Sequence, residues 1–80
     1  MKRGKEIPLA PIDRILHEEG CTRVSEEASR LLRDIVEKIA RTIAKEACEL
    51  AIHANRKTVM KEDVLFAARR ISKQIPSLFE

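Results

Sequence analysis

The chain has 80 residues and carries 16 Lys and Arg against 13 Asp and Glu, a formal net charge of +3 at pH 7. It lacks an apolar run of ~18 residues and a signal-peptide pattern, so we expect no membrane span and a protein that stays in the cytoplasm or on the chromosome. A chain this short buries only about 60% of the surface that its unfolded form exposes, so its own core should be marginal.

Composition also argues against catalysis. Cys21 and Cys48 are the only cysteines, and neither lies in a CxxC motif or near a pair of histidines. We therefore expect no metal site and no disulfide framework. The sequence contains no Gly-rich phosphate loop and no supported Ser/His/Asp set, so we expect no enzyme, no cofactor and no small-molecule substrate.

The first predicted helix covers residues 9–19 and follows a basic leader at residues 1–6. Apolar residues recur at three- and four-residue spacing, and Pro11 suits an early helical position, where its missing N–H costs nothing. Gly20 can adopt the left-handed conformation that ends a helix. The leader either reaches phosphates or only improves solubility.

The second predicted helix covers residues 26–54. Ser25 is a good N-cap, because its hydroxyl can accept a backbone N–H, and Glu26 and Glu27 stand at the positive end of the helix dipole. Asn55 tolerates the left-handed conformation and is the natural end. The apolar residues form a stripe broad enough to face neighbours on more than one side.

The third predicted helix covers residues 61–73, near the end of a domain that we place at 7–73, with a tail at 74–80. Cationic side chains gather near its negative end, as the helix dipole favours. Its predicted inner side consists of Val64, Leu65, Ala67, Ala68 and Ile71.

The length of the second helix is the most informative feature. At 1.5 Å per residue it would span roughly 44 Å, whereas a compact chain of this size has a diameter of only about 30 Å. A lone chain would expose a larger apolar patch than soluble monomers usually tolerate. We therefore predict an obligate dimer in which folding and association occur together. A helix-turn-helix reader is disfavoured, because its helices are much shorter.

The order of a short, a long and a short helix, with RVS before the long one and RKT after it, resembles the histone fold. The segments IPLAPIDRIL, GCTRVSEEA and AIHANRKTVMKEDVLFAARR are similar, in order and without gaps, to archaeal histones over about residues 7–71. The resemblance implies an all-α histone fold whose two chains cross in a handshake dimer. It also implies a chromatin protein that binds and bends double-stranded DNA with little sequence specificity.

The same resemblance implies a DNA-contacting surface built from the first helix and the two inter-helix loops. Lys57 can neutralise a phosphate and Thr58 can donate a hydrogen bond to one. Arg23 matches the family arginine that enters the minor groove. Arg56 matches the arginine of a structural ion pair with Asp63, so its DNA contact comes second. The DNA-binding residues implied are Arg14, Arg23, Arg56, Lys57 and Thr58.

Assembly beyond the dimer is implied through a four-helix bundle whose positions match Leu50, His53 and Asp63. A hydrogen bond from His53 to Asp63 across that interface would respond to pH. Dimers would then chain into tetramers or longer filaments on DNA. The plainer interpretation is that His53 is an ordinary, partly buried histidine.

Several positions depart from the family pattern or remain open. Asp13 and His17 stand where small or basic residues are common, and Asp13 should weaken DNA binding somewhat. Arg30 and Arg33 either touch DNA or form solvent-facing ion pairs. An alternative function is a histone-fold module that pairs with a different chain inside a regulatory or repair complex and wraps no DNA itself.

Overall fold

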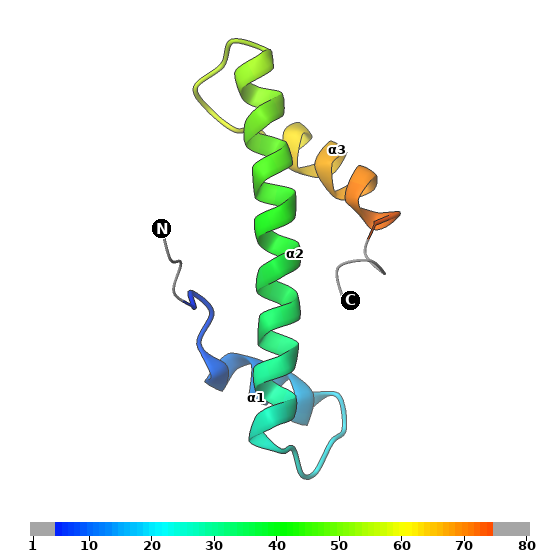
Figure 1. The fold of residues 1–80 in the computed structure, drawn as a ribbon. Helices are drawn as coiled ribbons and strands as arrows, with labels where there is room; N and C mark the ends of the chain where they lie inside the picture. The colour runs from blue at the N-terminus through cyan, green and yellow to red at the C-terminus, as the bar shows by residue number, and fades with distance from the viewer. Residues whose placement is uncertain (1–4, 75–80) are drawn as a thin grey trace. The chain divides into compact units, whose positions relative to one another are not determined.

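A computed structural model describes residues 5–74, which form three α-helices and, within that range, no β-strand (Figure 1). Helix α1 spans Leu9–Glu18, α2 spans Glu26–His53 and α3 spans Lys61–Ser72. Residues 19–25 form loop 1 and residues 54–60 form loop 2. The predicted all-α, short–long–short arrangement is confirmed, with each helix ending one residue earlier than expected. Residues 1–4 of the leader and 75–80 of the tail lie outside the described residues.

The ends of α1 and α2 follow from local sequence signals. The Ser25 hydroxyl accepts the Ala28 N–H at 3.1 Å, which caps the start of α2. Gly20 has a φ of 111° and Asn55 a φ of 60°, both in the left-handed region. After α1, the Cys21 N–H reaches back to the Leu16 carbonyl at 3.3 Å. The corresponding bond after α2 measures 2.9 Å. These are the long hydrogen bonds of Schellman motifs, so both helices end in the same way.

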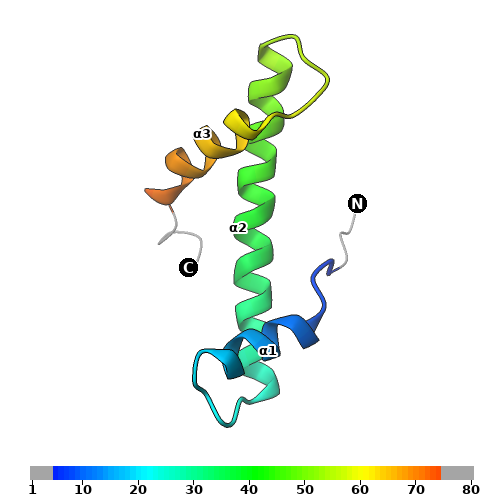
Figure 2. The same cartoon turned by 180° about the vertical axis from the view of Figure 1, so that it is seen from behind.

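The chain divides into two compact units, with the boundary between Glu37 and Lys38 inside α2. In the first unit α1 lies across the first part of α2, as both views show (Figures 1 and 2). Ile12 of α1 and Ser29 of α2 are buried there. The two elements that flank loop 1 are therefore packed on one another.

Glu37 anchors the segment that precedes α1. Its carboxylate is buried and accepts hydrogen bonds from the backbone N–H groups of Glu6 and of Ile7, the latter at 2.9 Å. The Arg33 guanidinium donates to the Ile7 carbonyl at 3.3 Å. Because backbone groups of an extended segment need partners, these side chains take the place of a neighbouring strand.

Replacing Glu37 with alanine should release this segment and lower the free energy of unfolding by about 1–3 kcal/mol, since two N–H groups lose their acceptor. Amide hydrogen exchange would report the release as faster exchange at Glu6 and Ile7. Glu37→Gln keeps one acceptor oxygen, so it should retain part of the protection. Equal exchange rates in the parent and in the alanine variant would show that the carboxylate does not hold the segment.

In the second unit α3 packs on the later part of α2 through small side chains. Ala47 and Ala51 of α2 and Ala67 of α3 are buried, with Ile71 beside them. Alanines allow two helix backbones to approach closely, and an ion pair from Arg70 to Glu46 at 3.2 Å lies at the same junction.

The predicted inner side of α3 is only partly correct. Ala67 and Ile71 are buried and Ala68 is half-buried, but Val64 and Leu65 are 45% and 49% exposed. Helical periodicity marks these two positions as apolar, yet α2 of the same chain does not cover them. The apolar face of α3 is thus wider than its intramolecular contact.

The single chain leaves much apolar surface uncovered. Within residues 5–74 the buried apolar residues number five, and three of these are alanines. Larger side chains remain open to solvent, among them Leu31 at 62% and Ile52 at 68% exposure. A core made largely of alanine buries little area, so the chain lacks the apolar burial that stabilises an independent domain.

Candidate nucleic-acid interface

Loop 2 is held to α3 by the side chain of Arg56. Its two terminal nitrogens donate to the two carboxylate oxygens of Asp63 at 2.8 and 2.9 Å, and one of them also donates to the Thr58 carbonyl at 3.1 Å. This is the ion pair that the family resemblance implies. A bidentate guanidinium–carboxylate pair fixes geometry as well as distance. The guanidinium therefore sets the path of the backbone from Arg56 to Thr58.

Asp63 is engaged on both oxygens and is well shielded. Its side chain is 8% exposed, and it also accepts the Met60 N–H at 2.8 Å at the start of α3. Hydrogen bonds from Arg56, and next from the Met60 backbone, lower the pKa of Asp63 to about 2. The pKa of Arg56 is raised in turn by its hydrogen bonds to Asp63. The carboxylate stays charged throughout the neutral range.

Replacing Asp63 with asparagine should lower the melting temperature by several degrees at neutral pH, because the variant loses the charged acceptor. The folded-state pKa lies below the ordinary carboxyl value of about 3.9, so this stabilisation is complete above that pH and disappears as pH falls towards about 2. Thermal melts of parent and variant should therefore converge over that window. The neighbouring exposed Glu62→Gln serves as control and should change little. Melting curves that stay equally separated down to pH ~2 would contradict this role for Asp63.

The loop held in this way exposes Lys57 and Thr58. Within residues 5–74 the Lys57 ammonium has neither an ion pair nor a hydrogen bond. The Thr58 carbonyl is engaged by Arg56, while its hydroxyl stands in an exposed position. A free ammonium beside a hydroxyl is the chemistry that contacts phosphate oxygens without reading bases.

Loop 1 and α1 expose the arginines of the first unit. Arg23 lies in loop 1 and Arg14 on α1, and both side chains are exposed. Their guanidinium groups have no ion pair among residues 5–74. The candidate residues thus fall into two sets, Arg14 and Arg23 in the first unit and Arg56, Lys57 and Thr58 in the second.

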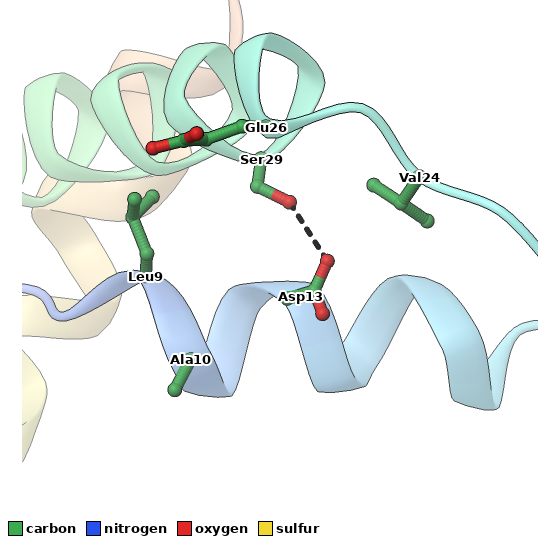
Figure 3. A pocket seen from close by; sticks show the side chains of 6 residues that line it. All are labelled: Leu9, Ala10, Asp13, Val24, Glu26 and Ser29. Atoms are coloured by element: carbon green, nitrogen blue, oxygen red, sulfur yellow. Dashed lines mark hydrogen bonds between the residues drawn. The ribbon is translucent and has the colours of Figure 1, made fainter.

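Asp13 and His17 take part in contacts that the sequence did not predict. The Ser29 hydroxyl donates to Asp13 at 3.1 Å, as Figure 3 shows between α1 and the start of α2. The other Asp13 oxygen lies 3.4 Å from Nε2 of His17. An open hollow of about 330 Å³ adjoins the pair and is lined by Leu9, Ala10, Asp13, Val24, Glu26 and Ser29. The spacing of four residues on one helix was the available signal.

The residues assigned to dimer–dimer contact differ in their surroundings. Leu50 is half-buried and His53 is exposed at the end of α2, whereas Asp63 is buried under Arg56. Asp63 accepts three hydrogen bonds from its own chain. A carboxylate has about four acceptor positions, so one remains for an outside donor.

The two arginines near the start of α2 are engaged inside the chain. Arg30 pairs with Glu26, and Arg33 pairs with Asp34 at 3.0 Å and with the segment before α1. Hydrogen bonds from Lys5, and next from Arg33, lower the pKa of Asp34. The ion-pair interpretation therefore holds for both arginines.

Metal and membrane sites are the other kinds that a chain of this size could carry. Between residues 5 and 74 no cluster of three His, Cys, Asp or Glu side chains is placed to hold a metal ion. No helix in that part of the chain has the length and apolar character needed to span a membrane.

These features define a small all-α protein whose two inter-helix loops present unpaired cationic side chains. A model of the histone-like transcription factor (CBF/NF-Y) and archaeal histone family matches residues 5–68. The chain is 47% identical over 64 residues to the archaeal histone HAN1 of Thermococcus zilligii, covering 80% of this chain and 96% of that protein. It is 48% identical over the same length, with the same coverage, to probable archaeal histone 3 of Methanocaldococcus jannaschii. The chain belongs to this histone-fold family, which confirms the resemblance seen in its sequence.

Proposed function

We propose that this chain is an architectural chromatin protein: a homodimer that binds duplex DNA through its backbone, bends it and compacts it. The observation that carries the proposal is loop 2, where the Arg56–Asp63 pair fixes a backbone that exposes Lys57 and Thr58. In a member of the histone family, that loop has the chemistry of a phosphate-binding edge. We expect the protein to work in the cytoplasm, on the chromosome.

Dimerisation is supported by the apolar surface that one chain leaves open. A second copy crossing α2 in a handshake would cover side chains along that helix, and it would place loop 1 of one chain beside loop 2 of the other. Arg23 would then stand near Lys57 and Thr58 of the partner copy. The formal charge of +3 per chain becomes +6 in the pair, which favours a polyanionic partner.

Affinity for DNA should depend steeply on salt, because each neutralised phosphate releases counterions. The experiment is a titration of a duplex of mixed sequence with the purified protein at several salt concentrations between ~50 and 200 mM. A steep linear fall of log K with log salt supports backbone binding. A nearly flat dependence would overturn it.

Larger assemblies would use Leu50, His53 and Asp63. The remaining acceptor position on Asp63 suits a hydrogen bond from His53 of a neighbouring dimer. Nuclease digestion of a reconstituted complex distinguishes the possible arrangements. Protected fragments that grow by a fixed increment indicate stacked dimers, whereas one fixed fragment size indicates a closed particle.

A second candidate function is that of a heterodimer half inside a larger complex. It is favoured by Asp13, a carboxylate on the presumed DNA side, and by the relative from Thermococcus zilligii, whose name describes it as a subunit. Sedimentation of the purified chain alone separates the two candidates. A discrete dimer supports the homodimer, whereas aggregated or unfolded chains support a required partner of different sequence.

A further inference from the structure

His17 lies between two oxygen acceptors at the C-terminal end of α1. Its Nε2 is 3.4 Å from a carboxylate oxygen of Asp13, and its Nδ1 is 2.9 Å from the backbone carbonyl of Cys21 in loop 1. The second oxygen of Asp13 accepts the Ser29 hydroxyl, which is buried on α2 (Figure 3). One continuous chain of polar contacts therefore joins α2, α1 and loop 1.

The proton count at His17 decides how many of these contacts exist at once. A neutral imidazole has a single N–H and can donate to only one of the two oxygens, whereas the imidazolium donates to both. Among the described residues, the charged groups around it are Asp13 and Arg14 on α1 and Glu18 and Glu19 after it, while α2 contributes Glu26, which lines the same hollow as Asp13. The geometry fits the protonated ring.

We propose that Asp13 and His17 form a proton-dependent clasp that positions loop 1 for DNA binding. Protonated His17 holds the Cys21 carbonyl against α1, two residues before Arg23, and offsets the charge of Asp13. Loss of the proton frees one contact and leaves a carboxylate on the presumed DNA side. The clasp thus deepens the proposed DNA binding, on which its functional role rests.

The direction of the effect follows from linkage. If the DNA-bound state prefers the protonated ring, affinity is highest at low pH and declines as pH rises through the range of about 5 to 8, where imidazoles change charge. Each dimer carries two clasps, and each is a half-exposed surface pair of modest strength. We expect a decline of roughly two- to tenfold across that range at constant ionic strength.

The first test measures DNA affinity against pH for the parent and three variants. His17→Lys keeps the charge permanently and should bind at all pH values as the parent does at low pH. His17→Gln lacks the charge and should bind as the parent does at high pH. Asp13→Asn removes the carboxylate and should bind more tightly at high pH. A pH profile in His17→Gln that matches the parent's profile would overturn the clasp, because His53 would then account for the dependence.

The second test uses the free homodimer and needs no DNA. An NMR titration should show the Thr22 amide, which follows the Cys21 carbonyl, shifting together with the His17 ring, and this coupling should vanish in His17→Gln. A Thr22 amide that does not respond would overturn the clasp even if DNA binding is intact. Absence of DNA binding at every pH, with the coupling present, would instead overturn the proposed function and the clasp's role in it.

Discussion

Replacement of Ile39 by aspartate is expected to leave the chain largely unfolded at micromolar concentration. Ile39 lies at the middle of α2, where two copies of a handshake would cross, and it is half-buried in the single chain. A carboxylate placed in that crossing loses its hydration without gaining a partner, at a cost of several kcal/mol. Since single domains have only ~5–15 kcal/mol of stability in total, and this chain has a core made largely of alanine, the pair should not form.

Circular dichroism and sedimentation of the Ile39→Asp variant measure this outcome together. Loss of helicity and loss of the dimer should coincide, because folding and association are one event in an obligate dimer. Ile39→Val is the matched control and should cost only about 0.5–1.5 kcal/mol while remaining dimeric. A helical, monomeric Ile39→Asp protein would disprove the dependence of folding on pairing.

The second large effect concerns the cations of the two loops. Replacing Lys57 with alanine removes two phosphate contacts per dimer, so the slope of log K against log salt should become shallower by about 1.8. Affinity at low salt should fall on the order of tenfold. Lys45→Ala makes the same charge change on an exposed part of α2 outside the loops. Equal changes of slope in both variants would mean that charge acts diffusely and that loop 2 is not a contact site.

Arg23 should behave differently from Lys57. An arginine inserted in the minor groove gains from the narrow grooves of A·T-rich segments, where negative potential is concentrated. Arg23→Ala should therefore weaken binding and also reduce the difference between A·T-rich and G·C-rich duplexes, whereas Lys57→Ala should weaken both equally. Competition between two duplexes of equal length measures that difference. An unchanged preference in Arg23→Ala would place the side chain on phosphates.

The predictions that the structure confirms depend on neighbouring residues. Ser25 caps α2 three residues away, and Gly20 and Asn55 end helices through bonds within a single turn. Such signals are carried by the chain itself, since residue type and spacing determine the contact. Arg56 and Asp63 are seven residues apart, and the family resemblance, more than periodicity, indicated that they would meet.

Contacts between distant segments were beyond the reach of the sequence. Glu37 stands among apolar residues of α2, but its partners are backbone groups 30 and 31 positions earlier, which no periodicity identifies. Val64 and Leu65 show the same limit in another form. A helical pattern reports that a side chain is apolar, but it does not tell whether its own chain or a second copy covers it. The cationic residues were predictable as a set, whereas their division between two units became clear only in the folded chain.

The forked contact between Arg56 and Asp63 also bears on the thermodynamics of DNA recognition. A segment that acquires its shape only on contact gives up conformational freedom at that moment, which subtracts from affinity. Loop 2 has already given up that freedom when the protein folds, because its path is tied to α3 at two points. Encounter with a duplex should therefore carry little entropic penalty from this loop, and rapid exchange between neighbouring sites along the double helix becomes compatible with tight holding.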